Sequence, residues 1–242
     1  MSDFTVSPCG DAALTVCFGE TIDEETAARV RSLRERLEGA RIRGITGFIP
    51  AYCSLTVCYD PLILSYKAAA RAAERAGAGL SGDAARTRTV HRIPVCYGGR
   101  FGEDLGEVAR LCGLTPDEVV RIHSGRDYLI YMIGFLPGFP YLGGMDGRIA
   151  CARLETPRTA IPAGAVGIGG DQTGIYPMES PGGWRLIGRT PVPLYDPDRD
   201  SPVLYRAGEY IRFCPVTLQE YMRIENDAKA GKYAHRAAEE SV

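Results

Sequence analysis

The stretch from Tyr128 to Pro215 constrains the fold most, because short apolar runs alternate there with Gly and Pro. Each run has the length of a strand, and the interruptions come too often for ordinary helices. Segments of this kind pack into a β-barrel or a sandwich whose loops are long enough to hold functional residues. We therefore predict that the C-terminal part of the chain is built on a β-sheet.

The first eighty residues have a different pattern, in which strand-like alternation is followed by helical spacing. Asp and Pro at the start of the apolar helical patterns and Gly at their ends favour two capped helices. This mixture predicts a small α+β sandwich and places the whole chain in the α+β class. The expected strands cover residues 4–8, 12–18, 42–49 and 54–59, and the expected helices run from Asp23 to Gly39 and from Asp60 to Gly77.

The chain is expected to contain two domains joined by a linker that is rich in glycine and small residues. Thr115 and Thr217 each precede a Glu by three residues, the capping-box pattern that starts a helix. The expected division is residues 1–80 for the N-terminal domain, 81–91 for the linker, 92–231 for the β-barrel domain with its C-terminal helix, and 232–242 for a disordered tail.

The formal net charge of −2, with acidic and basic residues intermixed, gives no basic surface for nucleic acid and no polybasic membrane patch. No apolar run approaches the roughly 20 residues that span a bilayer, and no leader precedes the first strand, so we expect a cytoplasmic protein. The eight cysteines are scattered and are expected to be reduced. The three histidines have no zinc-ligand spacing, so no metal site is expected.

The familiar phosphate-loop, nucleophile-elbow and zinc motifs are absent, so candidate sites must come from less standard segments. The segment from Gly134 to Gly144 holds Phe135, Phe139 and Tyr141 among prolines and glycines. A loop stiffened in this way predicts an aromatic wall for a small molecule. The alternative is a tight turn whose aromatics plug the end of a barrel.

Two further Gly-rich segments follow, residues 156–177 and 180–191, and each has a functional and a structural interpretation. Arg158 offers a planar fork for a carboxylate or phosphate, but the glycines after it also suit close sheet packing. Trp184 could stack on a flat ligand or anchor the core, and His123 is expected to be structural. The other polar or aromatic candidates in these segments are Gln172, Thr173, Tyr176 and Arg189.

Five sequence strings, taken in order, resemble the KipI family, which includes the B subunit of 5-oxoprolinase and is also called carboxyltransferase subunit 1 or allophanate hydrolase subunit 1-like. The resemblance covers about residues 93–215 and implies a cyclophilin-like β-barrel there, and the N-terminal part fits the α+β domain that precedes it in the family. The strings are IPVCYGG, GFLPGFPYLGG, TPR, IPAGAVGIGGDQTGIYP and SPGGWRLIGRTP.

The resemblance implies a subunit of an ATP-dependent 5-oxoprolinase that opens 5-oxoproline to glutamate and is inactive alone. It also implies two partners, a homologous carboxyltransferase-like protein (the KipA-like C subunit of 5-oxoprolinase) and the LamB/YcsF-like A subunit. The resemblance implies that ATP acts at the level of the complex, and this chain has no nucleotide motif of its own. Alternatives are an inhibitor of a sensor histidine kinase and a subunit of a biotin-dependent urea-type carboxyltransferase. No catalytic residue is assigned, and the expected substrate-binding residues are Phe135, Phe139, Tyr141, Arg158, Gln172, Thr173, Tyr176, Trp184 and Arg189.

Overall fold

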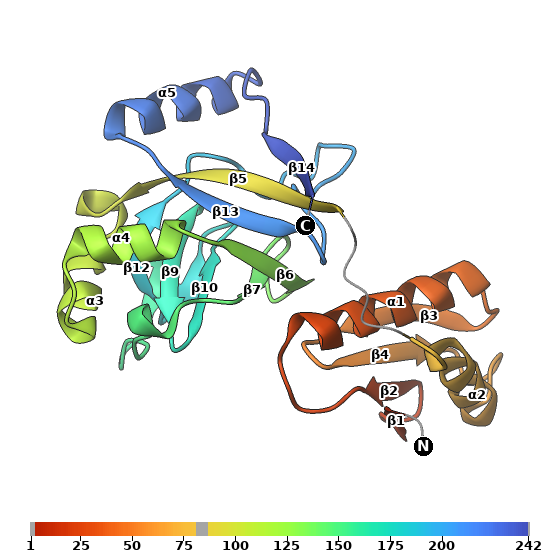
Figure 1. The fold of residues 1–242 in the computed structure, drawn as a ribbon. Coiled ribbons are helices and arrows are strands. Elements are labelled where there is room, and N and C mark those ends of the chain that lie inside the picture. The colour runs from red at the N-terminus through yellow and green to blue at the C-terminus, as the bar shows by residue number, and fades with distance from the viewer. Residues whose placement is uncertain (1–2, 81–86, 242) are drawn as a thin grey trace. The chain divides into compact units, whose positions relative to one another are not determined.

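The computed structural model describes residues 3–80 and 87–241, and the chain divides into two compact units, Met1–Ala85 and Arg86–Val242 (Figure 1). The expected α+β class is confirmed, with helices and strands in both units. None of the helices in the described residues combines the length and apolar character that crossing a bilayer requires.

The N-terminal unit is an antiparallel sheet of strand order β1-β2-β4-β3 with two helices packed on it. Alternate residues of β2 and β4 are buried, so only one sheet face is covered. Val30 and Leu33 of one helix and Ala69 of the other share a single core with Leu14 and Leu55 on that face. The elements are β1 (Thr5–Pro8), β2 (Ala13–Cys17), α1 (Glu24–Ala40), β3 (Ile45–Pro50), β4 (Ser54–Tyr59) and α2 (Tyr66–Gly77).

The starts of the two helices show how local chemistry sets their bounds. Asp23 caps α1, as expected, by accepting a hydrogen bond from the Thr26 N–H at 2.7 Å. The expected start of α2 at Asp60 was wrong. Asp60 accepts from the Leu62 N–H within a turn, and Ser65 is the N-cap instead.

The C-terminal unit contains a large sheet of order β10-β9-β12-β5-β13-β6-β7, with β14 also paired to β5 and a separate β11–β8 pair. Its helices are α3 (Leu105–Cys112), α4 (Pro116–Ser124) and α5 (Leu218–Lys229), and the 3-10 turns are Gly99–Phe101 and Gly147–Ile149. Its strands are β5 (Thr87–Tyr97), β6 (Asp127–Ile133), β7 (Pro140–Gly143), β8 (Arg158–Ile161), β9 (Ala165–Gly169), β10 (Gln172–Ile175), β11 (Ser180–Gly182), β12 (Arg185–Arg189), β13 (Tyr210–Pro215) and β14 (Ala237–Ser241).

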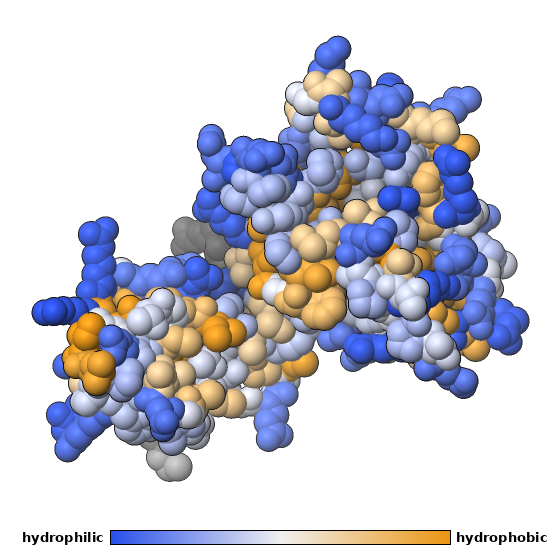
Figure 2. Space-filling view, turned by 180° about the vertical axis from the view of Figure 1, so that it is seen from behind, coloured by the Kyte–Doolittle hydropathy of each residue, from blue (hydrophilic) through white to orange (hydrophobic). Residues whose placement is uncertain are grey.

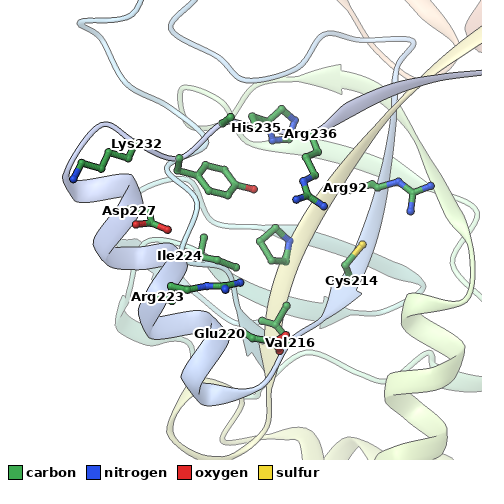
Figure 3. A pocket seen from close by; sticks show the side chains of 13 residues that line it. Arg92, Cys214, Val216, Glu220, Arg223, Ile224, Asp227, Lys232, His235 and Arg236 are labelled. Carbon is green, nitrogen blue, oxygen red and sulfur yellow. The ribbon is translucent and has the colours of Figure 1, made fainter.

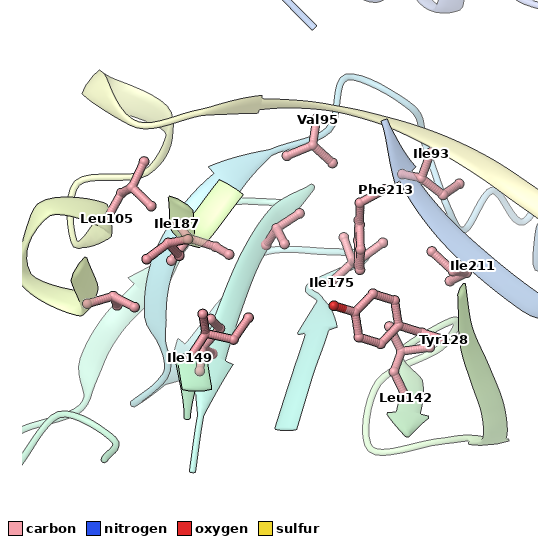
Figure 4. Packing of buried hydrophobic residues seen from close by; sticks show 14 of the residues in the cluster. Ile93, Val95, Leu105, Tyr128, Leu142, Ile149, Ile175, Ile187, Ile211 and Phe213 are labelled. Carbon is pink, nitrogen blue, oxygen red and sulfur yellow. The ribbon is translucent and has the colours of Figure 1, made fainter. Parts of the chain in front are cut away.

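This sheet curls into a nearly closed barrel. The end strands β7 and β10 lie side by side but are not joined by a ladder, which leaves a seam between them. Fully buried Ile93, Ile130, Ile175 and Phe213 fill the interior, and Figure 4 shows the buried side chains converging from several strands. The capping boxes of Thr115 and Thr217 are both present, which confirms those two helix starts.

Two boundary predictions were wrong at strand β5. Residues 87–91, expected in the linker, belong to β5, and residues 81–86 lie outside the described residues. The tail expected to be disordered contains β14, which pairs antiparallel with the start of β5. The free edge of β5 requires hydrogen-bond partners there, and β14 supplies them.

Ion pairs reinforce this pairing. Glu240 of β14 accepts from Arg92 at 3.2 Å and from Arg212 at 3.3 Å, and lies 3.5 Å from Arg88. Arg88 and Arg212 also bind Asp127 of β6, whose side chain is only 7% exposed. Charged side chains therefore link β14 to three other strands.

Apolar residues also remain on the surface of both units, as the orange patches in Figure 2 show. In the N-terminal unit the largest exposed examples near α2 are Leu62, Ile63 and Tyr66, with Leu62 95% exposed. Single exposed apolar side chains are common in soluble proteins, so these residues alone indicate no particular partner.

The two neighbouring glutamates of β14 offer a matched test of this pairing. Glu240→Ala should lower the free energy of unfolding by about 1 kcal/mol, because it removes a network of charge pairs. Glu239→Ala should change it by less than about 0.5 kcal/mol, since that side chain is exposed. Urea unfolding of both variants measures the difference, and equal effects would contradict the role of β14.

Candidate functional site

The loop between β6 and β7 is held in one conformation by its own backbone. The Gly134 N–H donates to Phe139 O at 3.1 Å and the Phe139 N–H to Leu136 O at 3.0 Å. The buried Tyr205 hydroxyl donates to Gly138 O at 2.7 Å. Phe135 sits at the tip with a left-handed φ of 64° and is 70% exposed. A non-glycine residue in this region is strained, so the surrounding loop must impose the conformation.

An aromatic cluster lies behind this loop, centred on the buried ring of Phe139. Its centroid is 5.3 Å from Tyr141, 5.6 Å from Tyr176 and 5.7 Å from Trp184, each in an edge-to-face arrangement. Phe135 adds a fourth edge-to-face contact at 5.8 Å. These separations suit favourable aromatic pairing, so the cluster forms a rigid wall.

Glycines in β9 and β10 make the space that Trp184 occupies. A Cβ at Gly169 would come within 2.3 Å of the Trp184 ring, and a Cβ at Gly174 within 3.0 Å. The indole is therefore packed on a part of the sheet that carries no side chains. The glycines of this segment serve sheet packing in this structure, one of the two interpretations that the sequence left open.

A pocket of about 180 Å³ opens beside this wall, at the seam between β7 and β10. Arg153 provides its cationic side chain, with the guanidinium carbon 5.9 Å from the centre of the Trp184 ring. Gln172, at the start of β10, contributes an amide. Its lining consists of Phe135, Phe139, Tyr141, Arg153, Gln172, Tyr176, Pro181, Gly182, Gly183 and Trp184.

The chemistry of this lining is suited to binding. Burial raises the pKa of the Tyr176 phenol despite a hydrogen bond from the Trp184 backbone and the nearby charges of Arg153 and Arg158. Tyr176 is therefore neutral and able to donate a hydrogen bond. Among the described residues that line the pocket there is no Asp, Glu, His, Lys or Cys, so it lacks an ordinary general base.

The pocket unites six of the nine expected site residues, Phe135, Phe139, Tyr141, Gln172, Tyr176 and Trp184. Arg158 lies outside its lining and is held by other groups. Its guanidinium donates to Asp104 at 2.8 Å and lies 3.0 Å from Glu103. Asp104 also accepts from the Leu186 N–H at 2.6 Å, so Arg158 ties β8 to the start of α3 and to β12.

Thr173 and Arg189 also lie outside the pocket lining. The Thr173 hydroxyl donates to Gly167 O at 2.9 Å and therefore accepts from His123 Nε2, 2.8 Å away. His123 Nδ1 then accepts from the Tyr97 hydroxyl at 2.7 Å. This buried network joins α4 to the barrel. Arg189 donates to Ala163 O at 2.8 Å, a loop contact.

Arg153, the cation of the pocket, is not among the site residues predicted from the sequence. It lies in an ordinary loop, Cys151-Ala152-Arg153-Leu154, outside the Gly-rich segments that attracted attention. Only the packing of that loop against Trp184 brings it to the site. All eight cysteines are free thiols, and among residues 3–80 and 87–241 no group of three or more His, Cys, Asp and Glu side chains could hold a metal ion.

Trp184 is the only tryptophan, so its fluorescence reports on the pocket wall. Gly169→Ala should displace the indole, shift its emission to longer wavelength and destabilise the unit by about 1–3 kcal/mol, because the new methyl has no space. Gly106→Ala, where a Cβ meets nothing within 4 Å, is the control and should leave the emission unchanged. Identical spectra for all three proteins would contradict the packing described for Trp184.

The buried His123 predicts a pH dependence of stability. Burial lowers its pKa from 6.5 to about 3, so the unfolded chain binds a proton that the folded chain excludes. The stabilisation is complete above the unfolded pKa and is lost as the pH falls from 6.5 towards 3. His123→Gln should reduce the slope of unfolding free energy between about pH 6.5 and pH 5, where carboxylates contribute little.

His235 is the control for this measurement, because burial also lowers its pKa, to about 4. His235→Gln should remove only its own part of the slope and leave the His123 part in place. An unchanged slope in His123→Gln would contradict the neutral, buried state of this imidazole.

Comparison with known proteins identifies relatives that match most of the chain. The family model described as carboxyltransferase domain, subdomain C and D, matches residues 4–205. The B subunit of 5-oxoprolinase from Bacillus subtilis (strain 168) is 42% identical over 228 residues, which cover 90% of this chain and 95% of that protein.

Solved structures also resemble this chain. The crystal structure of TTHA0988 is 40% identical, with a TM-score of 0.75 over 85% of this chain, and this chain spans only 40% of its length. The urea amidolyase of K. lactis matches 98% of this chain with a TM-score of 0.81 at 22% identity, which shows a shared fold; the match covers 16% of that protein. The chain belongs to the family of carboxyltransferase domain, subdomain C and D, proteins that includes the B subunit of 5-oxoprolinase.

Proposed function

We propose that this chain is a subunit of a cytoplasmic 5-oxoprolinase complex, a hydrolase that opens 5-oxo-L-proline to L-glutamate with ATP. The observation that supports this most is the 42% identity to the B subunit of the B. subtilis 5-oxoprolinase, which extends over nearly all of both chains. The pocket beside Trp184 is the part of the chain that we propose binds the lactam.

The pocket has groups that match each part of this substrate. Its volume of about 180 Å³ lies below the roughly 300–1,000 Å³ of sites for drug-sized ligands, which favours a small metabolite. The aromatic wall of Phe139, Tyr141 and Trp184 suits the apolar edge of the ring. Arg153 is a partner for the carboxylate, and Gln172 can both donate to and accept from the lactam amide.

The missing base in this pocket supports a role as one of several subunits. Ring opening needs an activated water or nucleophile, and the lining supplies aromatic rings, an amide and a guanidinium but no group that takes up a proton near neutral pH. ATP chemistry also needs a phosphate-binding loop, and this sequence has none of the usual ones. We propose that both functions come from a homologous carboxyltransferase-like subunit and a LamB/YcsF-like subunit.

A second candidate is a regulatory module that docks on a sensor kinase. Phe135 favours it, because this large ring is exposed at the tip of a rigid loop, as interface anchors are. A biotin-dependent carboxyltransferase is a third candidate, but the structural likeness to urea amidolyase at 22% identity bears on the fold alone. The 5-oxoprolinase role has the stronger support, because it rests on identity over the full chain.

Reconstitution tests the proposal. The chain should copurify with its two partners, and the mixture should release glutamate from 5-oxoproline only when ATP is present. The chain alone should neither hydrolyse ATP nor release glutamate from 5-oxoproline. Robust turnover by the purified chain alone would contradict the subunit role, and an assembled complex without activity on 5-oxoproline would contradict the substrate.

Arg153→Ala should raise the KM of the reconstituted complex for 5-oxoproline by about ten- to a hundred-fold, because it removes a charge-assisted bond worth about 1.5–3 kcal/mol. Folding should be unaffected, since this side chain is exposed. Arg110→Ala, on the exposed surface of α3, is the control and should keep the normal KM. Equal KM values in the two variants would remove Arg153 from the substrate site.

A further inference from the structure

A second and larger pocket lies in the C-terminal unit between α5 and the segment that follows it. Its volume is about 590 Å³, and it shares no lining residue with the aromatic pocket. Its floor is formed by Pro94 of β5, Cys214 of β13 and Val216, which directly follows β13. Figure 3 shows Cys214 and Val216 on this side of the pocket. A cavity of this size is typical of a small-molecule site.

The opposite wall is fixed by the way the chain leaves α5. Gly231 takes a left-handed φ of 67°, and the N–H groups of Lys232 and Tyr233 then donate to Asp227 O at 2.8 and 3.2 Å. The chain thereby turns back over the sheet, where the Arg92 N–H donates to Arg236 O at 3.1 Å. Residues 232–236 are held against β5 as a wall of the pocket.

The lining is rich in positive charge that the protein neutralises only in part. Arg92 is paired with Glu240, and Figure 3 shows its side chain directed away from the centre. The side chains of Arg223 and Arg236 extend into the pocket from opposite walls. In the described part of the chain, neither guanidinium forms a hydrogen bond or an ion pair. Two unpaired guanidinium groups that converge on the same space favour the binding of an anion there.

The carboxylates of the pocket offset only part of this charge. Glu220 accepts the N–H and the hydroxyl of Thr217 at 2.8 and 2.9 Å, so it is occupied in the helix cap. Asp227 is the other acidic residue in the lining, and the cationic residues besides the paired Arg92 are Arg223, Lys232 and Arg236. Three cations against two carboxylates leave a net positive charge, which suits an anionic ligand such as a phosphate monoester.

A chain of hydrogen bonds ends at this pocket with an unused nitrogen. Glu209 Oε2 lies 2.8 Å from His91 Nε2, and His91 Nδ1 lies 2.8 Å from His235 Nε2. The carboxylate can only accept, so His91 Nε2 holds the proton of that bond, and in the neutral form of His91 the Nδ1 atom accepts from His235. In that arrangement His235 Nδ1 carries a lone pair, and this buried atom has no partner among the residues that the structure describes. Such an orphan can accept a hydrogen bond from a ligand or from its bound water.

We propose that this pocket binds a phosphate monoester, with Arg223 and Arg236 clamping the phosphate. Tyr233 and Pro94 offer apolar faces for the organic part, and His235 Nδ1 can accept from a phosphate hydroxyl or a bound water. The site is separate from the aromatic pocket and does not depend on the function proposed for it. A free phosphorylated metabolite and inorganic phosphate share the recognised group, so the test compares probes of both kinds.

The test is isothermal titration of the full chain with phenyl phosphate, inorganic phosphate and phenol, at ionic strength matched with sodium chloride. Phenyl phosphate should bind saturably with one site, inorganic phosphate more weakly, and phenol not at all. Binding of inorganic phosphate as tightly as phenyl phosphate would remove Tyr233 and Pro94 from the site and overturn the monoester as its ligand. Absence of saturable binding by either anion overturns the proposal as a whole.

Variants locate the site. Arg223→Gln and Arg236→Gln should each weaken phenyl phosphate binding by at least about ten-fold, the loss expected for one charge-assisted bond. Both residues are exposed, so the variants should keep the unfolding temperature of the parent chain. Arg110→Gln removes the same charge from α3 and should bind normally. Equal weakening in all three variants would show a general charge effect and overturn the assigned pocket.

Discussion

The packing of Trp184 on β9 and β10 is the interaction on which the candidate site depends. The indole lies where Gly169 and Gly174 leave the sheet without side chains, and a methyl group at either position would overlap it or press on it. Because the indole is fixed there, Phe139 can meet it edge to face, and the loop that presents Phe135 follows from the position of Phe139. The position of the pocket wall therefore depends on the two glycines, whose lack of side chains leaves room for the indole.

Local signals in the sequence predicted much of the fold. The strand Ser54–Tyr59 and the helix starts after Asp23, Thr115 and Thr217 follow from alternation and capping chemistry, which act within a few residues. The start of α2 was misplaced because Asp60-Pro61 and Ser65 offer competing caps. Strand β14 was missed because Ala and Glu have low strand propensity, and its hydrogen bonds come from the distant edge of β5.

The aromatic part of the candidate site was also predicted from a local signal. Gly, Pro and aromatic residues occur together in one segment, and this pattern indicates a rigid aromatic wall. Arg158 looked like an anion ligand, yet Asp104 and Glu103, more than fifty positions earlier in the chain, hold its guanidinium. Arg153 gave no local signal, since only tertiary packing places it over Trp184. Which cation faces a ligand is decided by contacts between distant segments, and one sequence does not reveal them.

The aromatic wall is rigid, and its described lining holds no ordinary general base, which supports the proposed role as one of several subunits. The most direct test uses the single tryptophan, replaced by 5-fluorotryptophan, so that the labelled chain gives one ¹⁹F resonance even when unlabelled partners are bound. Addition of 5-oxoproline to the reconstituted complex should shift this resonance saturably, and proline, which lacks the lactam carbonyl, should not. A complex that turns over 5-oxoproline while the Trp184 resonance stays unchanged would contradict the assignment of the substrate to this pocket.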